Sequence, residues 1–219
     1  MAGALLSIMN SVLDSDTRLL VRLAAAIAGA DELNMRRIID EVVAGKVAPS
    51  MVEEVILQSY LFAGFPRTLN AARTWRAVSG FPAPESDESA SLRQSGNWES
   101  QGEKTCAAVY GDSYQLLRQN VRSLHPALDM WMIADGYGKV LSRPALDLER
   151  RELCIVGACA ASSQQRQLHS HFHGALNSGA SAEKVYAALD ALADLLVEGD
   201  LVRYRTLFTH VLARRTDVR

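Results

Sequence analysis

The sequence predicts an all-α fold in which two related helical regions form one compact unit. Of the 219 residues, 48% are hydrophobic, chiefly Ala, Leu and Val, and only 6% are aromatic. This composition suits close-packed helices better than stacked sheets, because Ala and Leu are among the best helix formers. Region 17–78 also shares its layout with region 151–211, as expected for a repeated helical unit.

Local signals place several helix boundaries. Ser50 and Glu53 have the spacing of a capping box, which predicts a helix that begins there and runs to about residue 63. Asp147 is a good N-cap for a helix that starts at the next residue. Gly179 followed by Ser181 predicts that one helix stops and another begins.

Charge and hydropathy limit the partners that the chain is expected to have. The formal net charge is -2 and no Lys/Arg cluster stands out, so nucleic acid is not an expected partner. No apolar run approaches the roughly 20 residues that cross a bilayer, so no membrane span is expected. Residues 1–13 are apolar but lack a preceding basic segment, which predicts a helix and not a secretory signal.

The chain has three cysteines, Cys106, Cys154 and Cys159. An odd number without a paired pattern argues against a disulfide framework and favours a cytoplasmic location. Cys154 and Cys159 lie in an apolar helical run, where burial would raise the pKa of a thiol and make it inert. We expect all three cysteines to be structural.

The chain divides into three segments by composition and layout. Residues 79–101 are rich in Ser, Pro, Gly and acidic side chains, which predicts a linker, although Trp98 within it could dock. Residues 1–78 are predicted to form a first helical repeat and residues 102–219 a second. The same number of positions separates Arg18 from Glu152 and Gly45 from Gly179, which supports the duplication.

Four sequence blocks carry a family resemblance: AGFPRTLNA (63–71), GEKTCAAVYGDSYQLL (102–117), GYGKVLSRPALDLERREL (136–153) and LHSHFHGALNSGAS (168–181). Together they resemble the carboxymuconolactone decarboxylase family. The resemblance implies an all-α fold of packed helix pairs and a small-molecule substrate. It also implies a homo-oligomer, most naturally a homotrimer for a chain with two fused repeats.

The resemblance also implies a site. In the superfamily's hydroperoxidase branch, which includes alkylhydroperoxidase D, a Glu, a Cys-x-x-Cys pair and a His act together. Laid on this chain, the pattern places Glu152 and His171 at the acid and base positions, as the implied catalytic residues. The two cysteine positions fall on Gln164 and Gln167. A thiol peroxidase needs a thiolate nucleophile, which glutamine cannot supply.

Both catalytic candidates have a structural alternative. Glu152 is either a solvated first-turn carboxylate favoured by the helix dipole or a partly buried proton donor or acceptor. His171 is either a core histidine held by one hydrogen bond or an acid–base group. His169 and His173 share a helix face, but a metal site needs a third ligand, so neither a metal nor another cofactor is expected.

Apolar and amide side chains are predicted to bind the substrate. Gln164 and Gln167 have the spacing that places them on one helical face with His171, and this face could line a pocket. Tyr60 and Phe65 belong to the first half and could add apolar walls to the same pocket.

Arginines distinguish the two halves. Arg18 and Arg37 occupy the acid and base positions of the first half, which therefore looks catalytically degenerate. Arg143 precedes the predicted catalytic helix, and its planar guanidinium suits a substrate carboxylate. The favoured alternative for Arg143 is a fixed salt bridge to Asp147 or another acid.

Three functions follow, in order of preference. The first is a lyase that acts on a small carboxylated, lactone-type substrate, with His171 as general acid or base and Glu152 orienting it. The second is hydroperoxide reduction, which would have to use Cys154, alone or with Cys159. The third is a non-catalytic oligomeric scaffold or ligand-binding protein.

Overall fold

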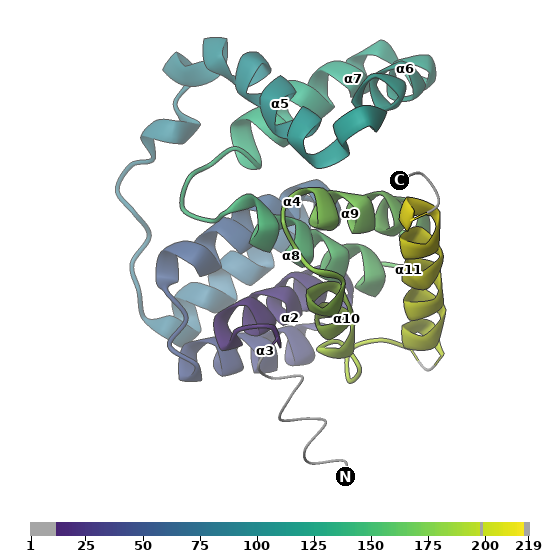
Figure 1. The fold of residues 1–219 in the computed structure, drawn as a ribbon. Helices are drawn as coiled ribbons and strands as arrows, with labels where there is room; N and C mark the ends of the chain where they lie inside the picture. Colours follow the sequence, from purple (N-terminus) through teal and green to yellow (C-terminus); the bar gives the residue numbers. More distant parts are fainter. Residues whose placement is uncertain (1–11, 198, 217–219) are drawn as a thin grey trace.

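The computed structural model describes residues 12–197 and 199–216, and every regular element within them is a helix (Figure 1). The predicted all-α fold is therefore confirmed. The predicted helix of residues 1–13 lies almost wholly outside the described residues. None of the helices in the described part is long and apolar enough to cross a membrane.

The first elements are α2 (Ser15–Gly29), α3 (Glu32–Ala44), α4 (Pro49–Ser79), η1 (Glu88–Ala90), η2 (Leu92–Gln94), α5 (Ser95–Tyr110) and η3 (Gly111–Ser113). They are followed by α6 (Tyr114–Leu124), α7 (Pro126–Trp131), η4 (Met132–Val140), α8 (Leu148–Ala161), α9 (Gln165–Asn177), α10 (Ala182–Asp190) and α11 (Asp200–Thr216). Element η4 is a π-helix, a form that is rare and often found at functional sites.

Helices α2 and α8 pack against each other at the centre of the larger body, and α3, α4, α9 and α10 surround them (Figure 1). The central helices are apolar on nearly every face: α8 is buried without interruption from Arg151 to Ala160. A helix that is hydrophobic all round is stable only inside a core, and this explains the central position of α8. Glu152 is thus carried into the interior by the helix on which it lies.

Helix α4 is two helices joined at a kink. Gly64 has φ 77 and ψ 163, a conformation that only glycine adopts readily, and Pro66 follows as the chain resumes its helix. The predicted capping box is wrong: Pro49 already occupies the first helical turn, Ala48 is the N-cap, and no side chain caps this end. The predicted end near residue 63 is close to the kink at Gly64.

The other boundary predictions are confirmed. Asp147 caps α8 by accepting a hydrogen bond from the backbone N–H of Arg150, and Ser181 caps α10 through Lys184. Asp14 caps α2 in the same way as Asp147 caps α8. The order of helices is also alike in the two flanking regions, with α2, α3 and kinked α4 resembling α8, α9 and the α10–α11 pair. The duplication itself stays a prediction.

Helices α5, α6, α7 and η4 form a separate layer above the larger body (Figure 1). Helix α5 begins at Ser95, inside the segment expected to be a linker, because buried Trp98 anchors its first turns. Elements α5 and η4 approach closely where side chains at Gly102 and Gly138 would collide with the opposing backbone. Within the segment 79–101, residues 80–87 and 91 lie outside helices.

Candidate functional site

Glu152 and His171 meet in the interior, as the sequence led us to expect. Nδ1 of His171 lies 2.7 Å from Oε2 of Glu152, although the two residues are 19 positions apart. Glu152 is 0% exposed and His171 5%. The short turn between α8 and α9 brings the two helices side by side, so side chains from consecutive helices face one another. The solvated alternative for Glu152 is therefore excluded.

Gly174 makes room for this pair. It lies on α9, three positions after His171, so it faces the same side of the helix. A methyl group at this position would collide with Oε2 of Glu152 and with Val109 of α5. Because Gly174 has no side chain, α9 can pass directly over the Glu152 carboxylate.

The second carboxylate oxygen of Glu152 is unoccupied by the protein. Oε1 is buried and has no hydrogen-bond partner among the described residues. A buried carboxylate oxygen without a partner costs free energy, and such atoms in native structures call for a functional explanation. Glu152 can therefore receive a hydrogen bond from a bound molecule while it holds His171.

Two buried tyrosines lie near enough to Glu152 to feel its charge, and sequence reasoning missed both. The rings of Tyr110 on α5 and Tyr137 on η4 lie 6.2 Å apart in an edge-to-face arrangement. Burial raises the pKa of each phenol well above its ordinary value, and the negative charge of Glu152 adds to the effect. Both phenols stay neutral and able to donate a proton in a hydrogen bond. Both tyrosines lie in sequence blocks that carry the family resemblance, 102–117 and 136–153, and this could have pointed to them.

A first-half aromatic side chain does contact the site, but it is Phe62. Its ring lies 5.7 Å from the His171 ring in a T-shaped arrangement. The predicted wall residues Tyr60 and Phe65 pack on each other at 5.1 Å, and Phe65 is 63% exposed. Tyr60 and Phe65 thus contact each other across the kink at Gly64.

Gln164 and Gln167 are exposed and do not share the buried position of His171. Gln164 precedes α9 as its N-cap residue and is not part of the helix, so the assumed helical spacing does not apply to it. The structure therefore does not bring the two glutamines into the buried position that His171 occupies. The two positions occupied by cysteines in the hydroperoxidase pattern face solvent here.

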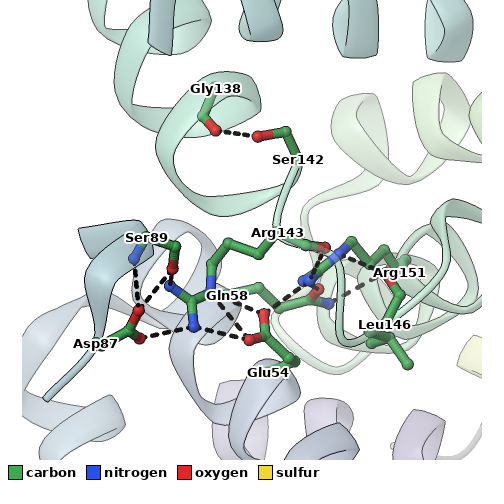
Figure 2. Close-up of polar contacts among 9 residues, drawn as sticks. All are labelled: Glu54, Gln58, Asp87, Ser89, Gly138, Ser142, Arg143, Leu146 and Arg151. Atoms are coloured by element: carbon green, nitrogen blue, oxygen red, sulfur yellow. Dashed lines mark hydrogen bonds and ion pairs between the residues drawn. The ribbon is translucent and has the colours of Figure 1, made fainter. Parts of the chain in front are cut away.

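Arg143 lies in an ion-pair network that does not include the Glu152–His171 pair (Figure 2). Its guanidinium lies 2.8 Å from Glu54 and 2.8 Å from Asp87, and it also donates to Ser89. The expected salt bridge is confirmed, but its partner is not Asp147, which pairs with Arg150. No substrate contact is needed to explain Arg143.

Neither thiol nor metal chemistry has support at this site. All three cysteines are buried, and burial raises the pKa of Cys106 and of Cys159 to about 12 and that of Cys154 still further. The described residues contain no group of three His, Cys, Asp or Glu side chains that could hold a metal ion. His169 and His173 have ring centroids 5.2 Å apart, and the described residues add no third ligand to them.

Comparison with known proteins agrees with this fold. The family model described as carboxymuconolactone decarboxylase family matches residues 128–196, a region that contains Tyr137, Glu152 and His171. A protein of Schizosaccharomyces pombe named peroxisomal protein 2 is 30% identical over 159 residues, which are 69% of this chain and 73% of that relative. The chain belongs to the carboxymuconolactone decarboxylase family.

Proposed function

We propose that the chain is a lyase that removes CO2 from a small carboxylated lactone by acid–base chemistry at Glu152 and His171. The observation that carries the proposal is the buried hydrogen bond of 2.7 Å between His171 Nδ1 and Glu152 Oε2. A carboxylate bonded to one imidazole nitrogen fixes the orientation of the ring and leaves the other nitrogen to exchange a proton with a substrate.

The reaction needs a proton at carbon. As the C–C bond to the carboxylate breaks, the electron pair stays on the ring carbon and is delocalised into the lactone system. CO2 leaves, and that carbon then takes a proton from Nε2 of His171. Glu152 keeps Nδ1 as its partner throughout, and its free Oε1 is available to a substrate donor. The ring of Phe62 packs against the imidazole in a T-shaped arrangement.

The test is turnover of γ-carboxymuconolactone and a panel of related carboxylated lactones, followed as CO2 release. His171→Ala should lower kcat by about 100- to 10,000-fold, the usual contribution of a general acid or base. Arg37→Ala is the matched control, because Arg37 holds the equivalent position in the first half and forms surface ion pairs. Full activity of His171→Ala, or no turnover of the panel by the wild type, would reject the proposal.

Hydroperoxide reduction is the weaker alternative. It requires a thiolate, and the raised pKa of Cys154 and Cys159 leaves almost none at neutral pH. A Cys154→Ser variant that keeps all the peroxidase activity of the wild type would eliminate this chemistry. If neither reaction is detected and Glu152→Gln and His171→Ala leave every phenotype unchanged, a ligand-binding or scaffold protein is what remains.

We further propose that the chain forms a homo-oligomer, with a homotrimer as the family resemblance implies. The support is a set of exposed apolar side chains on α6 and α7, 44% to 77% exposed, which we name the α6–α7 patch: Leu116, Leu124, Leu128, Met130 and Trp131. Light scattering should give a trimer mass that falls to the monomer mass in Trp131→Glu. Leu33→Glu is the control, since Leu33 is 82% exposed on α3, away from this patch. A wild-type monomer would contradict the proposal.

Two observations bear on the cellular location of the protein, and they disagree. The cysteine pattern favours the cytoplasm, whereas the relative from Schizosaccharomyces pombe bears a name that says peroxisomal. We propose the cytoplasm, because the free buried thiols of this chain suit a reducing compartment. The test is fluorescence imaging of the tagged chain together with a peroxisomal marker. Co-localisation with the marker would place the chain in the peroxisome and contradict the proposal.

A further inference from the structure

A group of histidines and arginines lies where α11 packs against α9. Nη1 of Arg215 lies 3.3 Å from Nδ1 of His173, and Nη2 lies 2.9 Å from Oδ1 of Asn177. The ring of His173 lies in turn 5.2 Å from the ring of His169, which is one turn earlier on α9. Together with the neighbouring arginine of α11, these side chains form what we call the α9–α11 cluster: His169, His173, Arg214 and Arg215.

The cluster has no carboxylate partner among the described residues. Arg205, on the same helix, forms an ion pair with Asp190, whereas no described residue forms one with either arginine of the cluster. The C-terminus of α11 supplies only about half a negative charge, which cannot balance two guanidinium groups. The part of the chain that the structure describes therefore leaves positive charge here without a counter-ion.

The two histidines respond to this charge. Burial and the positive charge of Arg214 lower the pKa of His169, while burial, His169 and Arg215 lower the pKa of His173. Both rings are therefore neutral at neutral pH, and each contributes an N–H donor. The same positive charges would repel a metal ion, so the occupant that the cluster favours is an anion.

Hydrogen bonding leaves donors of the cluster available. A guanidinium can only donate, so Nδ1 of His173 accepts from Arg215 and the proton of the neutral ring lies on Nε2. Within the described residues, nothing accepts from this N–H, from the ring of His169 or from the exposed guanidinium of Arg214. Donors from two helices are thus open to a bound anion.

From these observations we infer that the α9–α11 cluster binds the phosphate group of a small phosphate monoester. Such a group carries a charge of about −2 at neutral pH, which matches the two guanidinium groups, and its oxygens can accept from several N–H groups at once. A phosphodiester has a smaller charge and fewer free oxygens. The site stands independently of the lyase proposal, because none of its residues belongs to the Glu152–His171 pair.

The probes are methyl phosphate and dimethyl phosphate, titrated into the protein at about pH 7.5, where a monoester is a dianion. NMR follows the ring signals of His169 and His173. Methyl phosphate should shift both sets of signals to saturation and bind at least about tenfold more tightly than dimethyl phosphate, which has only one charge. Shifts no larger than those in sodium chloride of equal ionic strength, or equal affinity for the two phosphates, would overturn the inference.

Two variants locate the binding site. Arg214→Gln changes an exposed side chain, so the fold should persist, and the affinity for methyl phosphate should fall at least about tenfold. Arg36→Gln is the control: it removes the same charge from an exposed position on α3, away from α9 and α11 (Figure 1), and should leave the affinity unchanged. A similar fall in both variants would mean that phosphate responds to net charge alone, and would contradict the assignment.

Discussion

The guanidinium of Arg151 donates a hydrogen bond from Nη2 to Oε2 of Glu54 at 2.7 Å, and neither side chain is more than 5% exposed. The pair joins α8 to α4. Gln58 and the backbone carbonyls of Arg143 and Leu146 accept the other N–H groups of Arg151 (Figure 2). Burial lowers the pKa of Arg151, and the hydrogen bond and charge of Glu54 act in the opposite direction.

Replacing Glu54 should therefore destabilise the fold. Glu54→Gln leaves Arg151 buried and without its counter-charge, and the free energy of unfolding should fall by about 3–5 kcal/mol. Glu53→Gln is the control, because the Glu53–Arg76 pair is partly exposed and should contribute less than about 1 kcal/mol. Urea unfolding monitored by circular dichroism gives both values. An equal loss of unfolding free energy in the two variants would show that the buried pair stabilises the fold no more than the partly exposed one.

Gly174→Ala tests the geometry of the candidate site. The added methyl group must displace the Glu152 carboxylate, and overpacking of this kind costs about 1–3 kcal/mol of stability. Because Glu152 holds His171, kcat for the proposed lyase reaction should fall at least about tenfold, with a smaller change in KM. Gly136→Ala is the control, since a methyl group there meets no atom closer than 3.8 Å. Wild-type kinetics in Gly174→Ala would show that the close contact does not matter.

The three cysteines should be unreactive in the folded protein. The pKa of about 12 for Cys106 and Cys159, and the still higher one of Cys154, keep the thiols protonated at about pH 8. Iodoacetamide should modify none of them before unfolding and all three in concentrated urea, as read by mass spectrometry. Rapid modification of one thiol in the native protein would reopen the peroxidase hypothesis.

Acid should weaken the contact between the two halves through Asp194. Its hydrogen bonds with Arg22 hold the pKa of this carboxyl at about 2, below the ordinary 3.8. A lowered folded-state pKa stabilises the protein above pH 4 or so, and this stabilisation is lost as the pH falls towards about 2.

The Asp194→Asn variant isolates this contribution. The difference in urea midpoint between wild type and variant should be largest near neutral pH and should close as the pH falls towards about 2. Asp16→Asn provides a comparison at a partly exposed carboxylate in the first turn of α2. A difference that stays constant with pH would mean that Asp194 acts by packing and not by charge.

Much of the local structure could be read from the sequence. Asp147 and Ser181 cap helices as expected, because capping depends only on residues within one turn. Ser50 misled the prediction, because Pro49 already starts that helix. Trp98 anchors a helix inside the expected linker, which composition alone could not reveal, since burial depends on a partner surface from η4.

The sequence by itself determined an all-α chain, the family to which it belongs, and Glu152 and His171 as the residues to examine. Only the tertiary structure decided that Phe62 contacts His171, that the rings of Tyr110 and Tyr137 pack edge to face, and that Arg143 binds Asp87. The reason is physical: helical periodicity fixes which residues share a face of one helix. Which faces meet depends on the packing of segments that are distant in the chain, and no local pattern encodes that.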